Sequence, residues 1–199
     1  MKSRKIFGAL TAAAILTTLP AALPAGAADK LTIDPNHASA HFRVMHIGYS
    51  RVQVRFNDVR GNILFDQADV TKSSVSVVIK TASVDSNHKK RDDHLRSPDF
   101  FNAKEFPEMK FVSTRIEKTG AKTGKIHGNL TLLGVTKPVT LDVTFNRMGP
   151  NPLPGYNKIM TAGFSASTKV KRSEWGMKFA LGGIGDEIEI WLEVEAQKK

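Results

Sequence analysis

The sequence alternates between apolar and polar side chains in segment after segment, and this alternation constrains its fold more than any other feature. Residues 188–194, 139–145 and 75–79 each place an apolar side chain at every second position, with Val78 as an extra apolar residue. In an extended strand, every second side chain points to the same face. The sequence therefore predicts many strands that each bury one face.

The first residues have the layout of a cleavable secretion signal. Three basic residues precede an apolar run over residues 6–19, and small residues fill positions 25–28. This arrangement is typical of a signal peptide, and we expect cleavage after Ala27. A membrane anchor is the weaker reading, because the run is short and interrupted by prolines. The prediction is a signal peptide over residues 1–27, a periplasmic location, and a single domain over residues 28–199.

The composition narrows the classes of partner. The chain has no cysteine, so an oxidising compartment gives it no disulfide bonds. Its formal net charge is +10 at pH 7, a balance that often accompanies nucleic-acid binding. We expect no nucleic-acid partner, because the chain is exported and its lysines are spread among acidic residues. We expect instead that the positive charge favours weak association with anionic membrane surfaces.

Turn-forming residues divide the exported part of the chain into short strands. The predicted strands cover residues 31–33, 39–47, 51–57, 59–65, 74–80, 109–116, 125–133, 137–146, 158–170 and 186–196. Residues 86–97 are polar and helical, and 148–155 form a loop rich in Gly and Pro. Many short strands predict an antiparallel sandwich or barrel. The last strand contains no proline and reads as fully paired, which favours a closed barrel.

The interior of an eight-stranded barrel can be filled by its own side chains or can hold one ligand. Both alternatives fit the alternation. An outer-membrane barrel would show the same pattern. We disfavour it because the chain ends in Gln197-Lys198-Lys199 and has only two Tyr and two Trp for two aromatic girdles.

Short motifs along the chain narrow these alternatives. They are His-Ile-Gly-Tyr-Ser at 46–50, the segment 83–106, Gly-Asn-Leu-Thr-Leu at 128–132, Gly-Val-Thr-Lys-Pro-Val at 134–139 and Arg-Ser-Glu-Trp-Gly-Met at 172–177. In their order and spacing, the chain resembles the YceI-like family of periplasmic polyisoprenoid-binding proteins. The resemblance covers essentially the whole exported part.

The resemblance implies a fold and a ligand. The fold is all-β: an extended eight-stranded antiparallel lipocalin-like barrel with a short helical flap. Its apolar interior would hold a long-chain polyisoprenoid or a quinone-like lipid, for carriage, storage or stress response. No cofactor and no catalytic residue are implied beyond that bound lipid.

An isoprenoid tail has no hydrogen-bonding group, so its binding must come from hydrocarbon burial, at about 0.8 kcal/mol per CH₂. We expect the apolar face of each strand to line the cavity, although each of these residues also fits an ordinary core contact. The predicted lining is Phe42, Val44, Val54, Phe56, Ile63, Phe65, Val77, Ile79, Met109, Phe111, Leu132, Leu141, Val143, Phe164, Ile190 and Leu192.

The segment 83–106 is predicted to form a helical flap over one mouth of the barrel. Its charged side chains would pair on the short helix, and its apolar side chains would face inward. The predicted flap residues are Arg91, Asp92, His94, Leu95, Phe100, Phe101 and Phe106. The alternative is a salt-bridged lid that does not touch the ligand.

We predict no metal site. His37 and His41 share one face of a strand, whereas His46 points to the other face. His88 and His94 are six residues apart on the predicted helix, where neighbours on one face are three or four apart. Without cysteine, a structural zinc site is not expected.

Two other classes of function stay open. The alternative function is a lipid-modifying hydrolase or isomerase that uses His46 and Ser50 near the barrel mouth, although the chain has no Gly-x-Ser-x-Gly elbow. A homodimer is the other, because Trp191 lies on the polar face of the last strand, where an exposed aromatic ring suits a protein contact.

Overall fold

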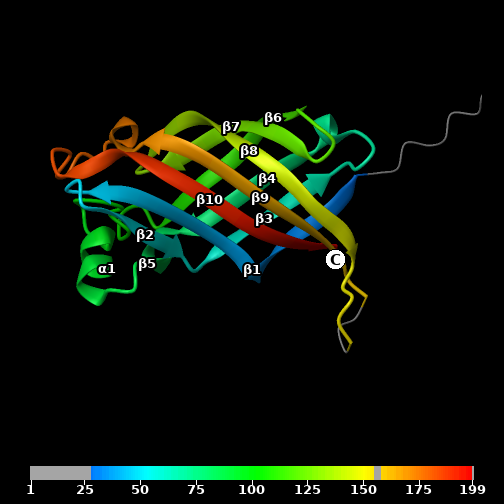
Figure 1. Cartoon of the computed structure of the whole chain (residues 1–199), viewed down its shortest axis with the longest axis horizontal. Coiled ribbons are helices and arrows are strands. Elements are labelled where there is room, and N and C mark those ends of the chain that lie inside the picture. Colours follow the sequence, from blue (N-terminus) through cyan, green and yellow to red (C-terminus); the bar gives the residue numbers. More distant parts are fainter. Residues whose placement is uncertain (1–27, 155–157, 199) are drawn as a thin grey trace, which may run out of the picture.

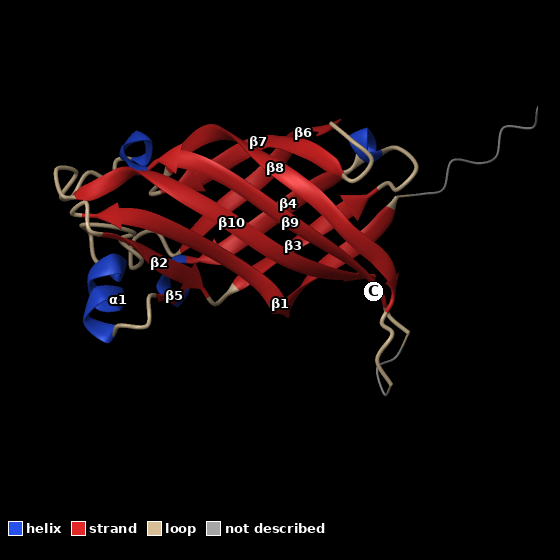
Figure 2. Ribbon diagram, viewed as in Figure 1, coloured by secondary structure: helices blue, strands red, loops and turns tan. Residues whose placement is uncertain are grey.

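The computed structural model describes residues 28–154 and 158–198, and most of these residues lie in β-strands (Figure 2). The predicted signal peptide, residues 1–27, lies outside the described part. The strands are β1 (Asp29–His46), β2 (Ser50–Phe56), β3 (Val59–Phe65), β4 (Ser74–Lys80), β5 (Val84–Asp85), β6 (Glu108–Lys118), β7 (Thr123–Leu132), β8 (Val135–Pro150), β9 (Met160–Lys171) and β10 (Ile184–Lys198). The helical segments are α1 (Lys89–Arg96) and three short turns, η1 (Val70–Lys72), η2 (Thr81–Ser83) and η3 (Arg172–Trp175).

The sheet closes on itself (Figure 1). Its strands follow the order β10-β9-β8-β7-β6-β4-β3-β1, each antiparallel to the next, and β10 pairs with β1 to complete the ring. Eight strands therefore form a closed barrel, with two further strands: β2 pairs with β1, and β5 pairs with β2. The prediction of an all-β, eight-stranded antiparallel barrel with a short helix is confirmed. Among the described residues, no helix has the length and apolar character needed to cross a bilayer.

β1 is one long strand where the sequence predicted two. The polar segment 34–37 lies between the predicted strands, and the register with β10 shifts across residues 33–38. Asp34 stabilises this bulge: it accepts a hydrogen bond from the Asn36 N–H at 3.0 Å, and His37 Nδ1 lies 2.8 Å from its other oxygen. A bulge tolerates the proline in this segment. β1 can therefore pair with β3 at its start and with β2 at its end.

The flap segment contains more regular structure than predicted. α1 is shorter than the predicted helical segment 86–97, and His88 begins it, with Nδ1 accepting a hydrogen bond from the Arg91 N–H at 3.3 Å. β5 precedes it as a two-residue pairing with β2. Two residues are too few to show an alternation, which is why the sequence did not indicate this strand.

The β7–β8 hairpin turns slightly earlier than the predicted position at 134–136. Leu133 and Gly134 form its turn, with φ angles of 50° and 72°. Two positive φ angles are the signature of the two-residue turn that best matches the twist of paired strands. β8 then continues to Pro150, into the start of the predicted loop, because it pairs with β9 as far as Met160.

Two apolar clusters lie inside the barrel, one after the other along its length. The cluster at the α1 end contains Trp175, Phe42 and Phe56 together with the buried residues of the flap segment. The cluster at the other end contains Leu31 and Phe65. The interior is therefore apolar from end to end.

Candidate functional site

Two cavities lie inside the barrel. The smaller, of about 140 Å³, lies at the α1 end between Phe101 and Trp175. The larger, of about 310 Å³, extends from the middle of the barrel towards the β6–β7 turn and η1. The two share three wall residues, Val77, Phe111 and Leu141. They therefore meet near the middle of the barrel and follow one after the other along it.

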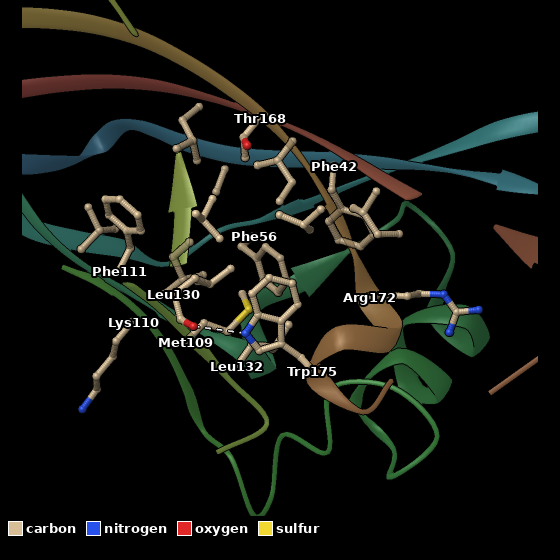
Figure 3. A pocket seen from close by; sticks show the side chains of 18 of the residues that line it. Phe42, Phe56, Met109, Lys110, Phe111, Leu130, Leu132, Thr168, Arg172 and Trp175 are labelled. Carbon is tan, nitrogen blue, oxygen red and sulfur yellow. Dashed lines mark hydrogen bonds between the residues drawn. The ribbon is translucent and has the colours of Figure 1, made fainter. Parts of the chain in front are cut away.

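The smaller cavity has an almost wholly apolar surface. Figure 3 shows the side chains of Lys110 and Arg172 extending away from it, so their charges do not enter the space. Trp175 is fully buried at its edge, and its Nε1–H donates a hydrogen bond to the Leu130 backbone oxygen at 3.1 Å. Because this bond satisfies the polar atom of the indole, Trp175 presents only hydrocarbon to the cavity.

Phe111 narrows the interior where the two cavities meet. Its ring packs over Gly128, where an added Cβ would lie only 2.3 Å from Phe111 Cζ. Gly128 therefore leaves the space in which the ring rests. Val77 is the partner of Phe111 on the neighbouring strand and completes this constriction.

The larger cavity is apolar at its depth and polar at its rim. Phe65, Phe145 and Phe164 form a cluster of rings in its wall, with centroids 5.4 to 5.6 Å apart. The rim is formed by residues 117–124, around the β6–β7 turn, and by polar side chains near η1 such as Ser73. This arrangement suits an apolar chain inside and a polar group at the opening.

The structure places most of the predicted lining in these walls. The wall residues from that prediction are Phe42, Phe56, Ile63, Phe65, Val77, Ile79, Met109, Phe111, Leu132, Leu141, Val143, Phe164, Ile190 and Leu192. Val44 and Val54 are not among them. Val54 is buried in the core instead, although Phe56, on the same face of β2, lines the smaller cavity. That a lipid contacts the wall residues stays a prediction.

Other wall residues were absent from the predicted lining. Val139 and Ile188 belong to alternating segments and have the same parity as predicted residues, so the period-two signal was sufficient to find them. Trp175 and Met177 lie in and just after η3, outside any strand. No periodicity marks such residues, and only the folding of this segment over the barrel end brings them inward.

The flap segment closes the α1 end. Leu95, Phe100 and Phe101 are buried, and Phe101 lines the smaller cavity. Phe106 is half-buried and lies against Gly134 in the β7–β8 turn. These apolar residues therefore face the barrel, and the predicted position of the flap at one mouth agrees with their burial.

A polar network joins α1 to the segment before it. Asp92 is buried and accepts hydrogen bonds from the Ser86 N–H, at 2.8 Å, and from the Ser86 hydroxyl. Arg91 donates to the Ser86 hydroxyl and to its backbone oxygen, both at 2.7 Å. His94 lies 2.7 Å from a carboxylate oxygen of Asp99. The charged flap residues are therefore paired locally and do not point into the cavity.

The two residues of the alternative function, a lipid-modifying enzyme, lie away from the cavities. His46 and Ser50 face each other across the β1–β2 pair, and both are exposed. Neither lines the two cavities described above. A lipid inside the barrel would therefore not reach this pair.

The outer face of β10 carries an aromatic stack. His41 lies parallel to Trp191, with centroids 5.5 Å apart, and the Arg43 guanidinium lies 5.9 Å from the same indole. Burial lowers the pKa of His41, and the charge of Arg55 lowers it further. Trp191 therefore has contacts within its own chain, and the homodimer stays a prediction.

Within residues 28–154 and 158–198, no three His, Asp or Glu side chains come close enough to hold a metal ion. His37 pairs with Asp34 in the β1 bulge, at 2.8 Å. His127 contacts Arg115 and Thr140 on the barrel wall. The histidines of this part of the chain thus make separate local contacts.

Known proteins resemble this chain in sequence or in fold. A UPF0312 protein of Serratia proteamaculans is 42% identical over 196 residues, which cover 98% of this chain and 97% of that protein. The crystal structure of a Campylobacter jejuni YCEI protein matches with a TM-score of 0.68 and 35% identity, over 77% of this chain and 89% of that chain. A polyisoprenoid binding domain from Saccharophagus degradans matches with a TM-score of 0.65 and 11% identity, over 86% and 99%.

The match to a family is equally extensive. Residues 31–196 match the YceI-like domain, and this range covers the barrel from its first strand to its last. The segments 128–132 and 172–177, on which the resemblance rested, supply Leu130, Trp175 and Met177 to the smaller cavity. The chain therefore belongs to the family of YceI-like domains.

Proposed function

We propose that this protein binds a long-chain polyisoprenoid, or a similar lipid such as a quinone, inside its barrel, and carries or stores it in the periplasm. The observation that carries the proposal is the pair of apolar cavities that meet at Phe111. Placed one after the other along the barrel, they suit a thin, long and flexible hydrocarbon better than a compact ligand.

Physical chemistry supports this ligand class. The walls offer almost no hydrogen-bonding group to a ligand in the smaller cavity, so specificity there depends on shape and on hydrocarbon burial. Each buried CH₂ contributes about 0.8 kcal/mol, and ordering of the chain offsets part of this gain. The polyisoprenoid binding domain of Saccharophagus degradans has the same fold, which supports the same class of ligand here.

The remaining parts of the proposal have separate support. The signal-like residues 1–27 support a periplasmic location. The exposure of His46 and Ser50, away from both cavities, supports binding without turnover. A role in stress response rests on the resemblance to the family, and we include it as one use of a stored or carried lipid.

The central residue Leu141 offers the sharpest test, because it belongs to both cavity walls. Leu141→Asp places an unpaired charge in the interior, which disfavours a hydrocarbon ligand strongly. Leu141→Trp instead fills the space with a larger apolar side chain. Thr144→Asp is the matched control, since Thr144 is exposed on the same strand. Native mass spectrometry of the purified proteins measures the lipid that each retains.

We expect the wild type and Thr144→Asp to retain lipid at similar occupancy, and both Leu141 variants to lose most of it. Circular dichroism identifies which variants are folded. If the buried charge of Leu141→Asp unfolds the barrel, the Leu141→Trp variant, which adds no charge, still tests the proposal. Full lipid occupancy in a folded Leu141→Trp protein would contradict the proposal. A wild type that never carries or takes up polyprenol or quinone would also contradict it.

A further inference from the structure

Four large apolar side chains are exposed together at the α1 end of the barrel. They are Ile47 and Tyr49 in the β1–β2 turn, and Phe179 and Leu181 in the loop between η3 and β10; we call them the tip patch. Their exposed fractions are 56%, 88%, 42% and 39%. Figure 1 shows both loops at the same end as α1. A group of exposed apolar residues on neighbouring loops indicates an interaction surface, whereas a single one does not.

The two loops of the tip patch are joined to each other and to the flap. The Ile47 N–H donates a hydrogen bond to the Gly183 backbone oxygen at 2.7 Å. Phe179 packs edge-on against Phe100 and His94, with centroids 5.4 and 5.2 Å apart. The patch is therefore held in place by contacts of Ile47 and Phe179. These contacts involve neither Tyr49, its most exposed member, nor Leu181 on the other loop.

Exposed cations lie beside the tip patch. Lys178 immediately precedes Phe179, and Lys90 lies on α1 one turn before His94; both lysines are exposed. Glu174 in η3 is an exposed carboxylate at the same end, whereas Asp99 is paired with His94. The whole chain carries a formal net charge of +10, of which Lys2, Arg4 and Lys5 in the predicted signal peptide supply three, so the exported part stays basic. These charges suit a partner with a negative surface.

We propose that the tip patch docks the protein on an anionic lipid bilayer. Tyr49 and Leu181 enter the headgroup region, and Lys178 and Lys90 contact lipid phosphates. Apolar side chains flanked by lysines bind such a surface through hydrocarbon burial combined with electrostatic attraction. A second copy of the chain fits less well, because two equally basic surfaces repel each other.

Docking in this orientation brings the smaller cavity next to the bilayer. Met177, two residues before Phe179, and Phe101, next to Phe100, both line that cavity. The loop between η3 and β10 thus contributes to both the tip patch and the cavity wall, and the flap segment that Phe179 contacts contributes Phe101 to the wall. Docking on a bilayer goes beyond the proposed function. It rests on that function in one respect only, namely that a lipid enters and leaves the barrel at the α1 end.

Vesicle flotation tests the docking directly. The exported protein is mixed with vesicles of phosphatidylcholine and phosphatidylglycerol, and with vesicles of phosphatidylcholine alone. The test variant is Tyr49→Ser with Leu181→Ser. The control variant is Val112→Ser with Leu153→Ser, which removes two residues that are 50% and 57% exposed on β6 and after β8. All four positions are exposed, so both variants are expected to fold.

We expect the wild type and the control to float with the anionic vesicles, and the test variant to partition at least about tenfold more weakly. Added salt should weaken wild-type binding, because the lysine contribution is screened. No flotation of the wild type, or equal flotation of the test variant, would overturn the proposal. A patch-dependent dimer in place of vesicle binding would also overturn it. Native mass spectrometry on the same samples keeps the two proposals separate, since a lipid-loaded protein that does not float refutes docking alone.

Discussion

Arg172 is a buried cation that stabilises the conformation of the loop before β10. Burial lowers its pKa, and the charge of Asp186 opposes that effect. The guanidinium donates hydrogen bonds of 2.9 Å to the backbone oxygens of Met177, Phe179, Ile184 and Gly185. Because a buried carbonyl without a partner is unfavourable, Arg172 makes this loop conformation possible, and with it the position of Met177 in the cavity wall.

Arg172→Lys is expected to destabilise the protein by about 2 kcal/mol, because an ammonium group cannot reach four carbonyl groups in the geometry of a guanidinium. Urea denaturation followed by circular dichroism measures the free energy of unfolding. Lys171→Ala serves as the control, since Lys171 is the exposed neighbour. Equal stability of Arg172→Lys and the wild type would show that the loop holds its shape without these bonds.

Two histidines give the stability a dependence on pH with opposite signs. Burial beneath Trp191 lowers the pKa of His41 below 6.5, so stability falls as the pH drops below 6.5 and His41 becomes protonated. The hydrogen bond with Asp34 raises the pKa of His37 above 6.5, so its contribution is complete below pH 6.5 and is lost as the pH rises through the folded pKa.

His41→Phe is therefore expected to flatten the stability curve on the acid side of pH 6.5, and His37→Asn on the alkaline side. Both substitutions leave the other group in place, and the phenyl ring preserves the stack on Trp191. Thermal unfolding between pH 5 and pH 8 is the measurement, with the range taken from the ordinary histidine pKa. A His41→Phe curve parallel to that of the wild type throughout would refute the assignment.

At the scale of secondary structure, α1 depends on its neighbours more than on its own sequence. Eight residues are too few for a stable isolated helix. Its stability comes from the hydrogen bonds of Asp92 and Arg91 to Ser86 and from burial of Leu95. Arg96 adds bonds to the backbone oxygens of η2 and β5. The flap is therefore tied to the barrel through the segment before it.

Asp92→Ala is expected to loosen this segment, because it leaves the buried Ser86 N–H without its acceptor, at about 1–3 kcal/mol. Limited trypsin digestion followed by mass spectrometry should show faster cleavage within α1. Asp93→Ala is the control on the exposed side of the same helix. If the flap also admits the lipid, bound lipid should slow cleavage in the wild type, and equal rates with and without lipid would exclude that gate.

At the scale of the molecule, closure of the barrel determines where a ligand can be. Because β10 pairs with β1, a ligand can reach the interior only through the ends of the barrel. One end is covered by the flap, and the other opens beside the β6–β7 turn. The side chains packed in the interior leave two cavities between them. A ligand that fills them should therefore stabilise the whole fold.

Removal of bound lipid is expected to lower the thermal midpoint, and addition of a polyprenol to restore it. A ligand at a hundredfold excess over its dissociation constant stabilises the folded state by about 2.7 kcal/mol. Differential scanning calorimetry before and after extraction measures the change. The Leu141→Trp protein is the control, since its filled interior should show no response. An unchanged midpoint in the wild type would argue that nothing binds inside.

Local patterns were enough to identify most of the strands and most of the wall residues. The alternation at 75–79, 139–145 and 188–194 marks β4, β8 and β10, because the side-chain direction in a strand depends only on its own backbone. The same rule led to wall residues such as Phe111 and Leu141. The motifs indicated the family, which the match over residues 31–196 confirms.

Other features arise from contacts between distant segments, and no local pattern contains them. Val54 and Phe56 share one face of β2, yet only Phe56 lines a cavity, whereas Val54 is buried in the core. Trp175 reaches the cavity only because η3 folds over the barrel end, where the indole Nε1–H donates a hydrogen bond to the Leu130 backbone oxygen. The apolar face of each strand could be predicted from the sequence, since the direction of its side chains depends on that strand alone. Whether they enclose a space depends on how closely opposite walls approach, and that distance is set by the closure of all eight strands together.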